Sequence, residues 1–174
     1  MTGIRIEPSG PADAEALGAV YADAFGRPPF DEGPEVVAAW RDESLPQHAA
    51  RAGFRCLAAW DDDLVVGFTY GYTGEYGQWW TDQIAAVVPP ALAAEWLGGH
   101  FELVELAVRP SHERRGIGAG LHDRLLDGLS HRVALLTATD DATAPARRLY
   151  HRKGWEPLAD HVFEGSTLMG KRLS

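Results

Sequence analysis

The chain has 174 residues, enough for one compact domain with a sizeable buried core. Its formal net charge of -9 argues against general nucleic-acid binding and is compatible with a cationic amine as a partner. A lone cysteine, Cys56, rules out an internal disulfide and favours a reducing compartment, and no apolar run of about 18 residues marks a membrane span. We therefore expect one cytoplasmic domain over residues 1–174 that binds neither nucleic acid nor membrane.

Hydrophobic periodicity and turn residues divide the first half of the chain into alternating strands and helices. In chain order they predict a strand at 4–7, a helix at 12–25, a loop at 26–33, short helices at 35–42 and 46–52, and strands at 54–60 and 64–72. The acidic turn Asp61-Asp62-Asp63 between the last two strands fits a β-hairpin.

Residues 73–100 form a connection rich in glycine and tryptophan. A Pro-Pro pair at 89–90 opens a predicted helix that ends at the Gly-Gly pair at 98–99, and we expect Trp96 on this helix in the core. Long connections inside compact domains are usually functional or disordered, and this one is aromatic. An acceptor pocket that includes this segment is predicted from three aromatic residues, Tyr72, Trp79 and Trp80.

The second half of the chain continues the alternation of strands and helices. Its patterns predict a strand at 102–108, a helix at 118–129, a strand at 133–139, a helix at 143–153, and closing strands near 155–158 and 167–172. Leu121, Leu125 and Leu129 lie four apart and mark the buried face of the first of these helices. Gly154 stands where a glycine commonly ends a helix.

The most informative segment is the basic, glycine-rich turn between the strand at 102–108 and the following helix. It contains Arg114, Arg115, Gly116, Gly118 and Gly120. A helix start leaves about four N–H groups unpaired and carries roughly half a positive charge, while glycines let a phosphate approach the backbone closely. The turn lacks the Lys-Ser/Thr pair of a Walker A loop and the glycine spacing of a dinucleotide fingerprint, so it predicts a phosphate site of another kind.

Two motifs in this half appear in a fixed order. The first is the strand end Leu-Ala-Val-Arg-Pro at 106–110 followed by Glu-Arg-Arg-Gly-Ile-Gly at 113–118. The second is Thr-Ala-Pro-Ala-Arg-Arg-Leu-Tyr-His-Arg-Lys-Gly-Trp at 143–155. Together they resemble the GCN5-related N-acetyltransferase (GNAT) family, whose patterns are [Gln/Arg]-x-x-Gly-x-[Gly/Ala] and Asn-x-x-Ala-x-x-Leu-Tyr-x-x-x-Gly-[Phe/Trp/Tyr]. The resemblance covers about residues 100–174, and Glu113 and Thr143 depart from the family pattern.

The resemblance implies an α/β fold with a mixed, mostly antiparallel central sheet of about six or seven strands flanked by helices. It also implies acetyl-CoA as cosubstrate, with its pyrophosphate on the glycine-rich turn and its pantetheine arm along the strand before it. The residues that the resemblance assigns to the coenzyme are Leu106, Ala107, Val108, Arg114, Arg115, Gly116, Ile117, Gly118, Ala119, Gly120, Thr143 and Ala146. Thr143 keeps a short polar group able to cap the second helix or to contact the pantetheine arm.

Acetyl transfer to an amine needs a base for the amine proton, a donor for the oxyanion and an acid for the departing thiolate. Tyr150 falls at the family's general-acid position, although a core tyrosine would occupy the same place on the helix. Glu102, where some relatives carry a catalytic Glu, and then Glu105 are the candidate bases. Residues three apart on an ideal strand point to opposite faces, so both line one pocket only if a bulge intervenes.

The function that follows is an acetyl-CoA-dependent N-acetyltransferase that works by direct attack on a primary amine in a ternary complex. Two alternatives stay open: a noncatalytic acyl-CoA-binding sensor, and an acyltransferase with another acyl donor or a hydroxyl acceptor. The acceptor is a small-molecule or peptide amine, relatives are often homodimers, and the histidine spacing implies no metal. We read His100, just before the strand, as a surface histidine.

Overall fold

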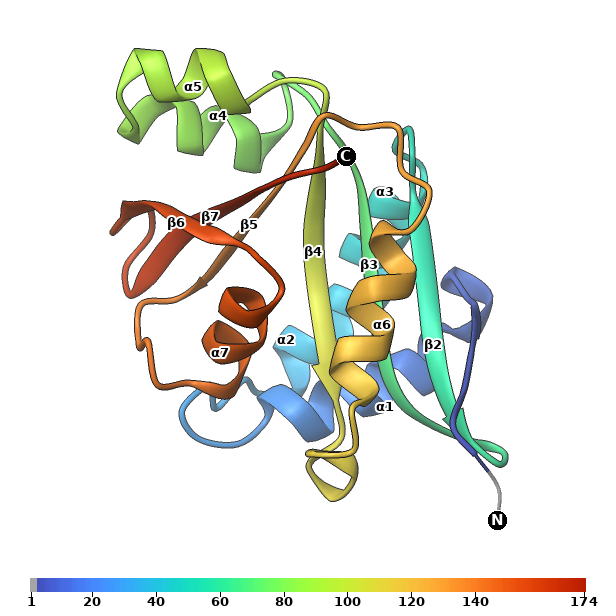
Figure 1. Ribbon diagram of the computed structural model, residues 1–174. Helices are drawn as coiled ribbons and strands as arrows, with labels where there is room; N and C mark the ends of the chain where they lie inside the picture. Colours follow the sequence, from blue (N-terminus) through green and yellow to red (C-terminus); the bar gives the residue numbers. More distant parts are fainter. Residues whose placement is uncertain (1–2) are drawn as a thin grey trace. The chain divides into compact units, whose positions relative to one another are not determined.

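The computed structural model describes residues 3–174, and these form two compact units (Figure 1). Unit 1 comprises residues 3–72 and 104–127, and unit 2 comprises residues 73–103 and 128–174. Strand β4, His100–Val108, begins in unit 2 and ends in unit 1. Over the described residues, seven strands form a mixed, mostly antiparallel sheet in the order β1-β2-β3-β4-β5-β7-β6, which confirms the predicted fold class.

Unit 1 is built on strands β1 to β4. Its elements are β1 (Arg5–Pro8), η1 (Pro11–Asp13), α1 (Ala14–Phe25), α2 (Pro34–Ala39), η2 (Trp40–Ser44), α3 (Leu45–Ala49), β2 (Arg55–Asp61), most of β3 (Leu64–Gly74), the end of β4, η3 (Pro110–His112) and α6 (Ile117–Leu126). β2 and β3 pair antiparallel around Asp62, whose left-handed backbone (φ 53°) allows the tight turn. The predicted hairpin is confirmed.

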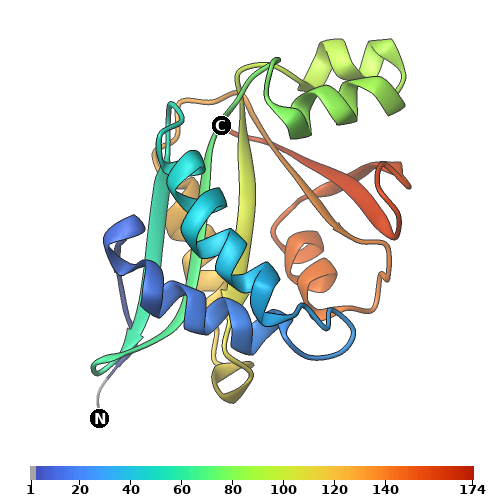
Figure 2. The ribbon, with the colours of Figure 1, turned by 180° about the vertical axis from the view of Figure 1, so that it is seen from behind.

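Helices cover both faces of the unit 1 strands. Figure 2 shows α1, α2 and α3 on one face, and Figure 1 shows α6 on the other. On the α1 face, Leu17 and Val20 are fully buried and Tyr21 stacks on Trp40 with ring centroids 4.7 Å apart. On the α6 face, a Cβ at Gly67 would lie 3.2 Å from Leu121, so the absence of a side chain lets the helix approach the sheet. The predicted helical stripes are therefore core-forming.

Two helix boundaries in unit 1 differ from the sequence-based expectation. The helices predicted at 35–42 and 46–52 form one continuous helical run over 34–49, joined by a π turn at Trp40–Ser44. Pro46 does not break the run, because it lies in the first turn of α3. Helix α6 ends at Leu126 and not at 129, since Asp127 is extended and Gly128 has φ 72°. Leu129 consequently lies beyond the helix.

Unit 2 carries the other end of the sheet. Its elements are α4 (Trp79–Val87), α5 (Pro90–Trp96), the start of β4, β5 (Val133–Thr139), α7 (Pro145–Arg152), β6 (Glu156–Asp160) and β7 (Ser166–Arg172). β4 and β5 pair parallel, with Phe101 opposite Ala134 and Glu102 opposite Leu135, and helix α6 lies between them in the chain as a parallel connection requires. β7 pairs antiparallel with both β5 and β6.

The aromatic segment of unit 2 is more ordered than its composition indicates. Residues 79–87 form helix α4, which the glycine- and tryptophan-rich pattern did not predict. The helix opened by the Pro-Pro pair is confirmed as α5, and Trp96 on it is buried as expected. Gly154 has φ 86° and follows α7, which confirms it as the glycine that ends this helix. Over residues 3–174, no helix combines the length and the apolar character needed to cross a bilayer.

Candidate active site

The glycine turn, residues 113–120, joins the end of β4 to α6 within unit 1. Gly116 immediately precedes the helix and has a left-handed backbone (φ 76°), as does Arg114 (φ 64°). A Cβ on Gly116 would have no described heavy atom within 4 Å, so the backbone conformation requires glycine here and the space beside it is open. No described side chain caps α6, which leaves its first N–H groups to water or to a ligand.

The helical hydrogen bonds define which amides are available. The Gly120 N–H donates to the Gly116 carbonyl at 3.0 Å and closes the first helical bond. The preceding N–H groups of Ile117, Gly118 and Ala119 are those that helix geometry leaves for an anion. A Cβ on Gly120 would lie 3.1 Å from Ile6 Cδ1, so packing against β1 accounts for this glycine. Its role in coenzyme binding stays a prediction.

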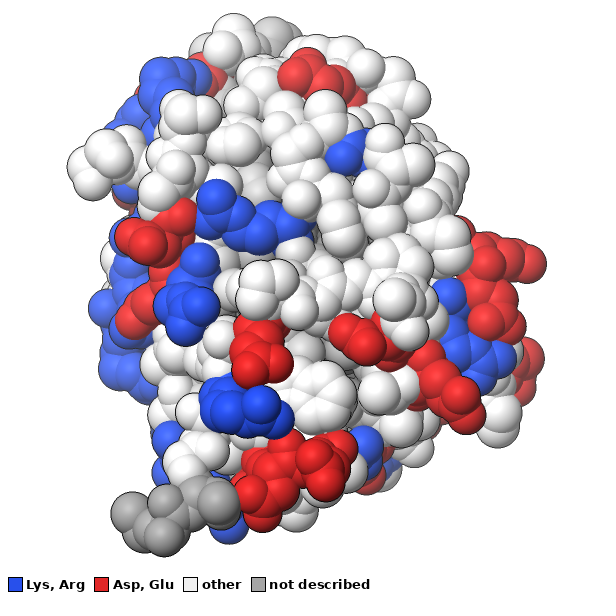
Figure 3. Space-filling view, turned by 90° about the vertical axis from the view of Figure 1, so that its right-hand side faces the viewer, with Lys and Arg blue, Asp and Glu red and all other residues white. Residues whose placement is uncertain are grey.

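Charged side chains surround the turn. Arg114 and Arg115 are exposed, and Glu113 accepts a hydrogen bond from Arg27 Nη2 at 2.9 Å. Arg109, at the end of β4, donates through Nε to the Val65 carbonyl at 2.8 Å and pairs with Asp23 at 3.2 Å. Figure 3 shows one face of the molecule, on which basic and acidic side chains are interspersed. Exposed pairs of this kind contribute little to folding stability, about 0–1 kcal/mol each.

Glu105 lies near buried phenols of unit 1. Its carbonyl accepts a hydrogen bond from Thr69 Oγ1 at 2.7 Å. Burial, and then the negative charge of Glu105, raise the pKa of both Tyr21 and Tyr70 above the ordinary tyrosine value, so both hydroxyls stay protonated. Glu32 contributes to the raised pKa of Tyr21 as well. The negative charge of Glu105 therefore disfavours ionisation of both phenols.

A second polar group lies around Tyr70. Burial, and then the charge of Arg51, lower the pKa of His48 to about 4, so its ring is neutral. The Tyr70 hydroxyl accepts a hydrogen bond from Trp40 Nε1 at 3.2 Å and shares a second hydrogen bond with His48 Nδ1 at 2.8 Å. Arg51 lies over the ring of Tyr72, 4.7 Å from its centroid, and donates to its hydroxyl. A guanidinium of the chain itself thus occupies one face of this predicted acceptor residue.

In unit 2, the start of β4 carries a buried acid and a buried histidine. Glu102 is 4% exposed and His100 only 1%, so His100 is not the surface residue expected from the sequence. It is the first residue of a strand that the pattern started two residues later. Its Nδ1 accepts the Gly98 N–H at 3.1 Å, and burial, then His131, lower its pKa to about 4. The ring is therefore neutral, with its hydrogen on Nε2.

Helix α7 holds the second motif. Tyr150 is buried and packs edge-to-face on Trp155, with ring centroids 5.9 Å apart, and the Trp155 N–H donates to the Tyr150 carbonyl at 3.0 Å. The helix begins two residues later than predicted, with Ala144 before it, and no described side chain caps it. The capping role expected for Thr143 is therefore wrong: its hydroxyl donates to Asp141 at 2.6 Å. Ala146 is exposed in the first turn.

The two predicted acceptor tryptophans are neighbours on α4 but differ in surroundings. Trp79 is 65% exposed and stacks parallel to Phe163 at 5.6 Å. Trp80 is half-buried and lies against His100 with ring centroids 5.9 Å apart. Unit 2 therefore brings Trp80 together with His100, which is two residues from Glu102.

Comparison with known proteins agrees with these geometries. The sequence matches the model described as the Acetyltransferase (GNAT) family over residues 19–155, which is most of the chain and includes both motifs. The chain belongs to the GNAT acetyltransferase family. Members of this family are acyltransferases that use acetyl-CoA.

Individual proteins resemble this member of the GNAT family in sequence or in fold. It is 38% identical over 101 residues to the GCN5-like protein acetyltransferase Rv2170 of Mycobacterium tuberculosis, a match over 54% of this chain and 49% of that protein. The match thus spans about half the length of that curated relative. The fold resembles PH1933 from Pyrococcus horikoshii OT3 (TM-score 0.73, 19% identity, 99% of each chain covered). It also resembles the PaiA N-acetyltransferase of Thermoplasma acidophilum solved with coenzyme A (TM-score 0.67, 14% identity, 98% of this chain and 99% of that chain).

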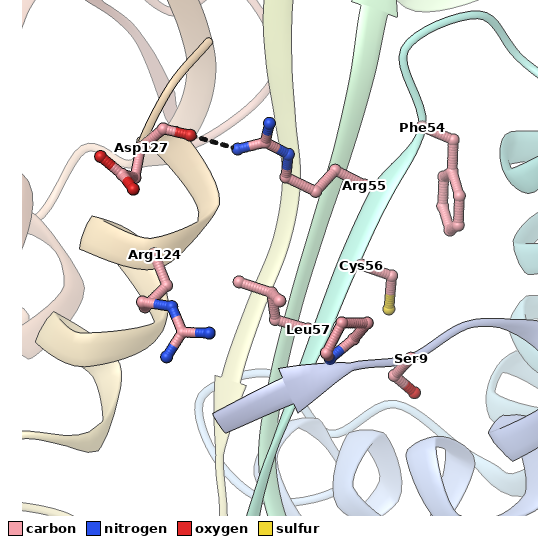
Figure 4. Close-up of a pocket in the computed structure, with 8 residues that line it drawn as sticks. Ser9, Phe54, Arg55, Cys56, Leu57, Arg124 and Asp127 are labelled. Atoms are coloured by element: carbon pink, nitrogen blue, oxygen red, sulfur yellow. Dashed lines mark hydrogen bonds between the residues drawn. The ribbon is translucent and has the colours of Figure 1, made fainter. Parts of the chain in front are cut away.

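A cavity in unit 1 of the GNAT acetyltransferase lies away from the glycine turn, at the other end of α6 (Figure 4). Its volume is about 420 Å³, and its lining includes Cys56, Arg124 and Asp127. Arg55 crosses it and donates to the Asp127 carbonyl at 2.6 Å. Burial raises the pKa of the Cys56 thiol to about 12, so the thiol stays protonated near neutral pH. Within residues 3–174, no group of three or more metal-ligating side chains comes together.

Sequence reasoning missed two groups, one in each unit. Arg27 lies 86 positions from Glu113, and the only available signal was an acid in a motif position that usually holds Gln or Arg. His131 was also missed, although its Nε2 is 2.8 Å from the Thr73 hydroxyl and its ring packs edge-on against Phe101. These contacts join residues that are distant in sequence, so no periodic sequence pattern predicts them.

Proposed function

We propose that this chain is an acetyl-CoA-dependent N-acetyltransferase that transfers the acetyl group to a primary amine by direct attack in a ternary complex. The observation that carries the proposal is the glycine turn. Left-handed Gly116 leads into an uncapped helix start beside open space, and two exposed arginines adjoin it. Such a turn suits a pyrophosphate, because several N–H groups converge on one anion without a Cβ in the way.

The coenzyme's other contacts follow from the family pattern. The backbone of Leu106 to Val108 is proposed to pair with the amides of the pantetheine arm, which would bring the thioester to β4. An N–H of this strand is then available to stabilise the oxyanion. Thr143 and Ala146, near the start of α7, are proposed as further coenzyme contacts because the family pattern assigns them this role. Because Thr143 does not cap α7, its exposed position leaves it available for such a contact.

A base must remove a proton from the ammonium group, since only the neutral amine attacks. Glu102 and Glu105 on β4 remain the candidates. Glu102 is almost fully buried at the start of β4. Glu105 is half-buried, and its negative charge raises the pKa of two buried phenols, Tyr21 and Tyr70.

Tyr150 is the proposed acid for the departing thiolate. Its ring is fixed by burial and by the edge-to-face contact with Trp155, so its hydroxyl has a defined position. Direct transfer is favoured over a covalent acetyl-enzyme, because the thiol of Cys56 is buried and protonated, and it lines the cavity that lies away from the glycine turn.

The acceptor is proposed to be a small-molecule or peptide amine. Tyr72, Trp79 and Trp80 remain its proposed aromatic contacts, with Trp79 the most exposed of the three. One observation favours the second candidate, a noncatalytic acyl-CoA-binding sensor: Glu113 places a carboxylate at the turn where the family pattern has Gln or Arg.

A thiol-release assay with acetyl-CoA and a panel of primary amines, amino acids and peptide N-termini tests the proposal. We expect at least one amine to release CoA well above the rate of acetyl-CoA hydrolysis, with mass spectrometry showing one added acetyl group on the amine. Gly118→Glu serves as the control, because a carboxylate inside the glycine turn repels the pyrophosphate. Binding of acetyl-CoA without transfer to any amine would instead support the sensor.

A further inference from the structure

The glycine turn has an electrostatic conflict that its motif does not predict. Glu113 begins the turn and is exposed, so its carboxylate adds a negative charge to the segment that is proposed to bind a doubly negative pyrophosphate. Like charges repel, and an uncompensated carboxylate at this point would oppose the helix start and the neighbouring arginines. The turn is therefore better suited to a phosphate when this charge is neutralised.

Arg27 supplies the opposite charge from elsewhere in unit 1. Its Nη2 lies 2.9 Å from Glu113 Oε1, and both side chains are half-exposed. Arg27 belongs to the connection between α1 and α2, which is itself hydrogen-bonded: the N–H groups of Phe30 and Asp31 both donate to the Arg27 carbonyl at 2.9 Å. The backbone of Arg27 is therefore held in place, which lowers the entropy lost when the pair forms.

A second ion pair links the same two parts of unit 1. Arg109, just before the turn, pairs with Asp23 at 3.2 Å, and its Nε bond to the Val65 carbonyl fixes the guanidinium. Asp23 lies in the last turn of α1, four residues before Arg27. Two separate ion pairs thus hold the end of α1 and its following connection against the β4–α6 connection. The contact between Arg27 and Glu113 is part of this arrangement and not an isolated surface pair.

We propose that Arg27 is a positioning residue of the coenzyme site, an internal counter-ion that neutralises Glu113 so that the glycine turn can accept the pyrophosphate. This inference rests on the proposed function. Arg27 is far in sequence from both motifs, and its positive charge compensates the negative charge of Glu113, which stands where the family pattern has Gln or Arg. The net charge of the pair is zero in the wild type, +1 when only Glu113 is neutralised and -1 when only Arg27 is removed.

The charge count fixes the order of coenzyme affinities. An exposed unit charge close to a dianion changes affinity by on the order of three- to tenfold at low ionic strength, and by less in about 0.5 M salt. Arg27→Ala leaves one uncompensated negative charge and should therefore bind CoA about three- to tenfold more weakly than the wild type. Glu113→Gln should bind more tightly, and the double variant should return to the wild-type affinity.

Isothermal titration calorimetry with CoA on the four proteins, at low and at high salt, tests the inference. Rescue of Arg27→Ala by Glu113→Gln, with a difference that shrinks at high salt, is the expected result. A merely structural role for Arg27 would leave the double variant as weak as Arg27→Ala, which would overturn the proposal. Equal affinity of Arg27→Ala and wild type would overturn it as well.

Circular dichroism melting curves of all four proteins show whether each one is folded at the titration temperature. A wild type that does not bind CoA at all would overturn the proposed function, and this inference with it. A wild type that binds CoA, with the wrong order among the variants, overturns this inference alone.

Discussion

Replacing Gly116 by alanine separates the backbone requirement of the glycine turn from its role in phosphate binding. Gly116 has φ 76°, a conformation that costs an L-residue about 1–2 kcal/mol. A Cβ there would meet no described atom within 4 Å, so no steric clash adds to this cost. We expect the melting temperature to fall by about 2–8 °C.

Gly128 provides a matched control beyond the other end of α6. Its φ is 72°, and a Cβ on it would likewise have no described neighbour within 4 Å. Gly128→Ala should therefore lower the melting temperature about as much as Gly116→Ala. Only Gly116→Ala places a methyl group beside the amides that are proposed to bind phosphate.

The two variants should differ in coenzyme affinity. Disturbing one hydrogen bond to a charged group costs about 1.5–3 kcal/mol, which corresponds to an increase of about ten- to hundredfold in the Kd for CoA. Calorimetry well below both melting temperatures should show this loss for Gly116→Ala and wild-type affinity for Gly128→Ala. Equal losses in the two variants, or no loss in either, would refute the assignment of the glycine turn to the pyrophosphate.

Three further predictions concern the proposed catalytic groups and acid stability. Tyr150→Phe should reduce kcat with little change in the Kd for CoA, and an unchanged kcat would make Tyr150 a packing residue only. Of Glu102→Gln and Glu105→Gln, the one that removes the base should flatten the acidic limb of the pH–rate profile, whereas two unchanged profiles would point to water as the base. Because the pKa of His100 is lowered from 6.5 to about 4, the unfolded state binds more protons in that range, so stability should be lost as pH falls from 6.5 to 4. His100→Asn, which keeps an acceptor for Gly98, should show a smaller loss in urea unfolding, and an equal loss would contradict the buried neutral state of His100.

Local patterns sufficed for much of the fold. The stripe of Leu121 and Leu125, the acidic hairpin turn and the glycine after α7 each reflect interactions among neighbours in sequence, and the structure confirms them. The glycine turn was predicted for the same reason, because strand, glycines and helix start are contiguous. Other elements departed from their local pattern: Trp79 to Val87 are helical despite the glycine-rich context, and the helical run continues past Pro46, which lies in the first turn of α3.

The charge environment of the candidate site was not predictable from local patterns. The partner of Glu113 is 86 residues away, and the effect of Glu105 on Tyr21 joins two elements that are distant in sequence. His100 illustrates the same limit, since only the fold shows that the ring is buried and neutral. Motif departures such as Glu113 mark where long-range compensation is to be sought.

We propose that this member of the GNAT family moves an acetyl group from acetyl-CoA directly to an amine. The most direct measurement is mass spectrometry of enzyme and amine together after a single turnover with isotopically labelled acetyl-CoA. We expect label on the amine, none on the protein, and the same result for Cys56→Ala. Label retained on the protein, or acetyl-CoA bound but left intact with every amine tested, would contradict it.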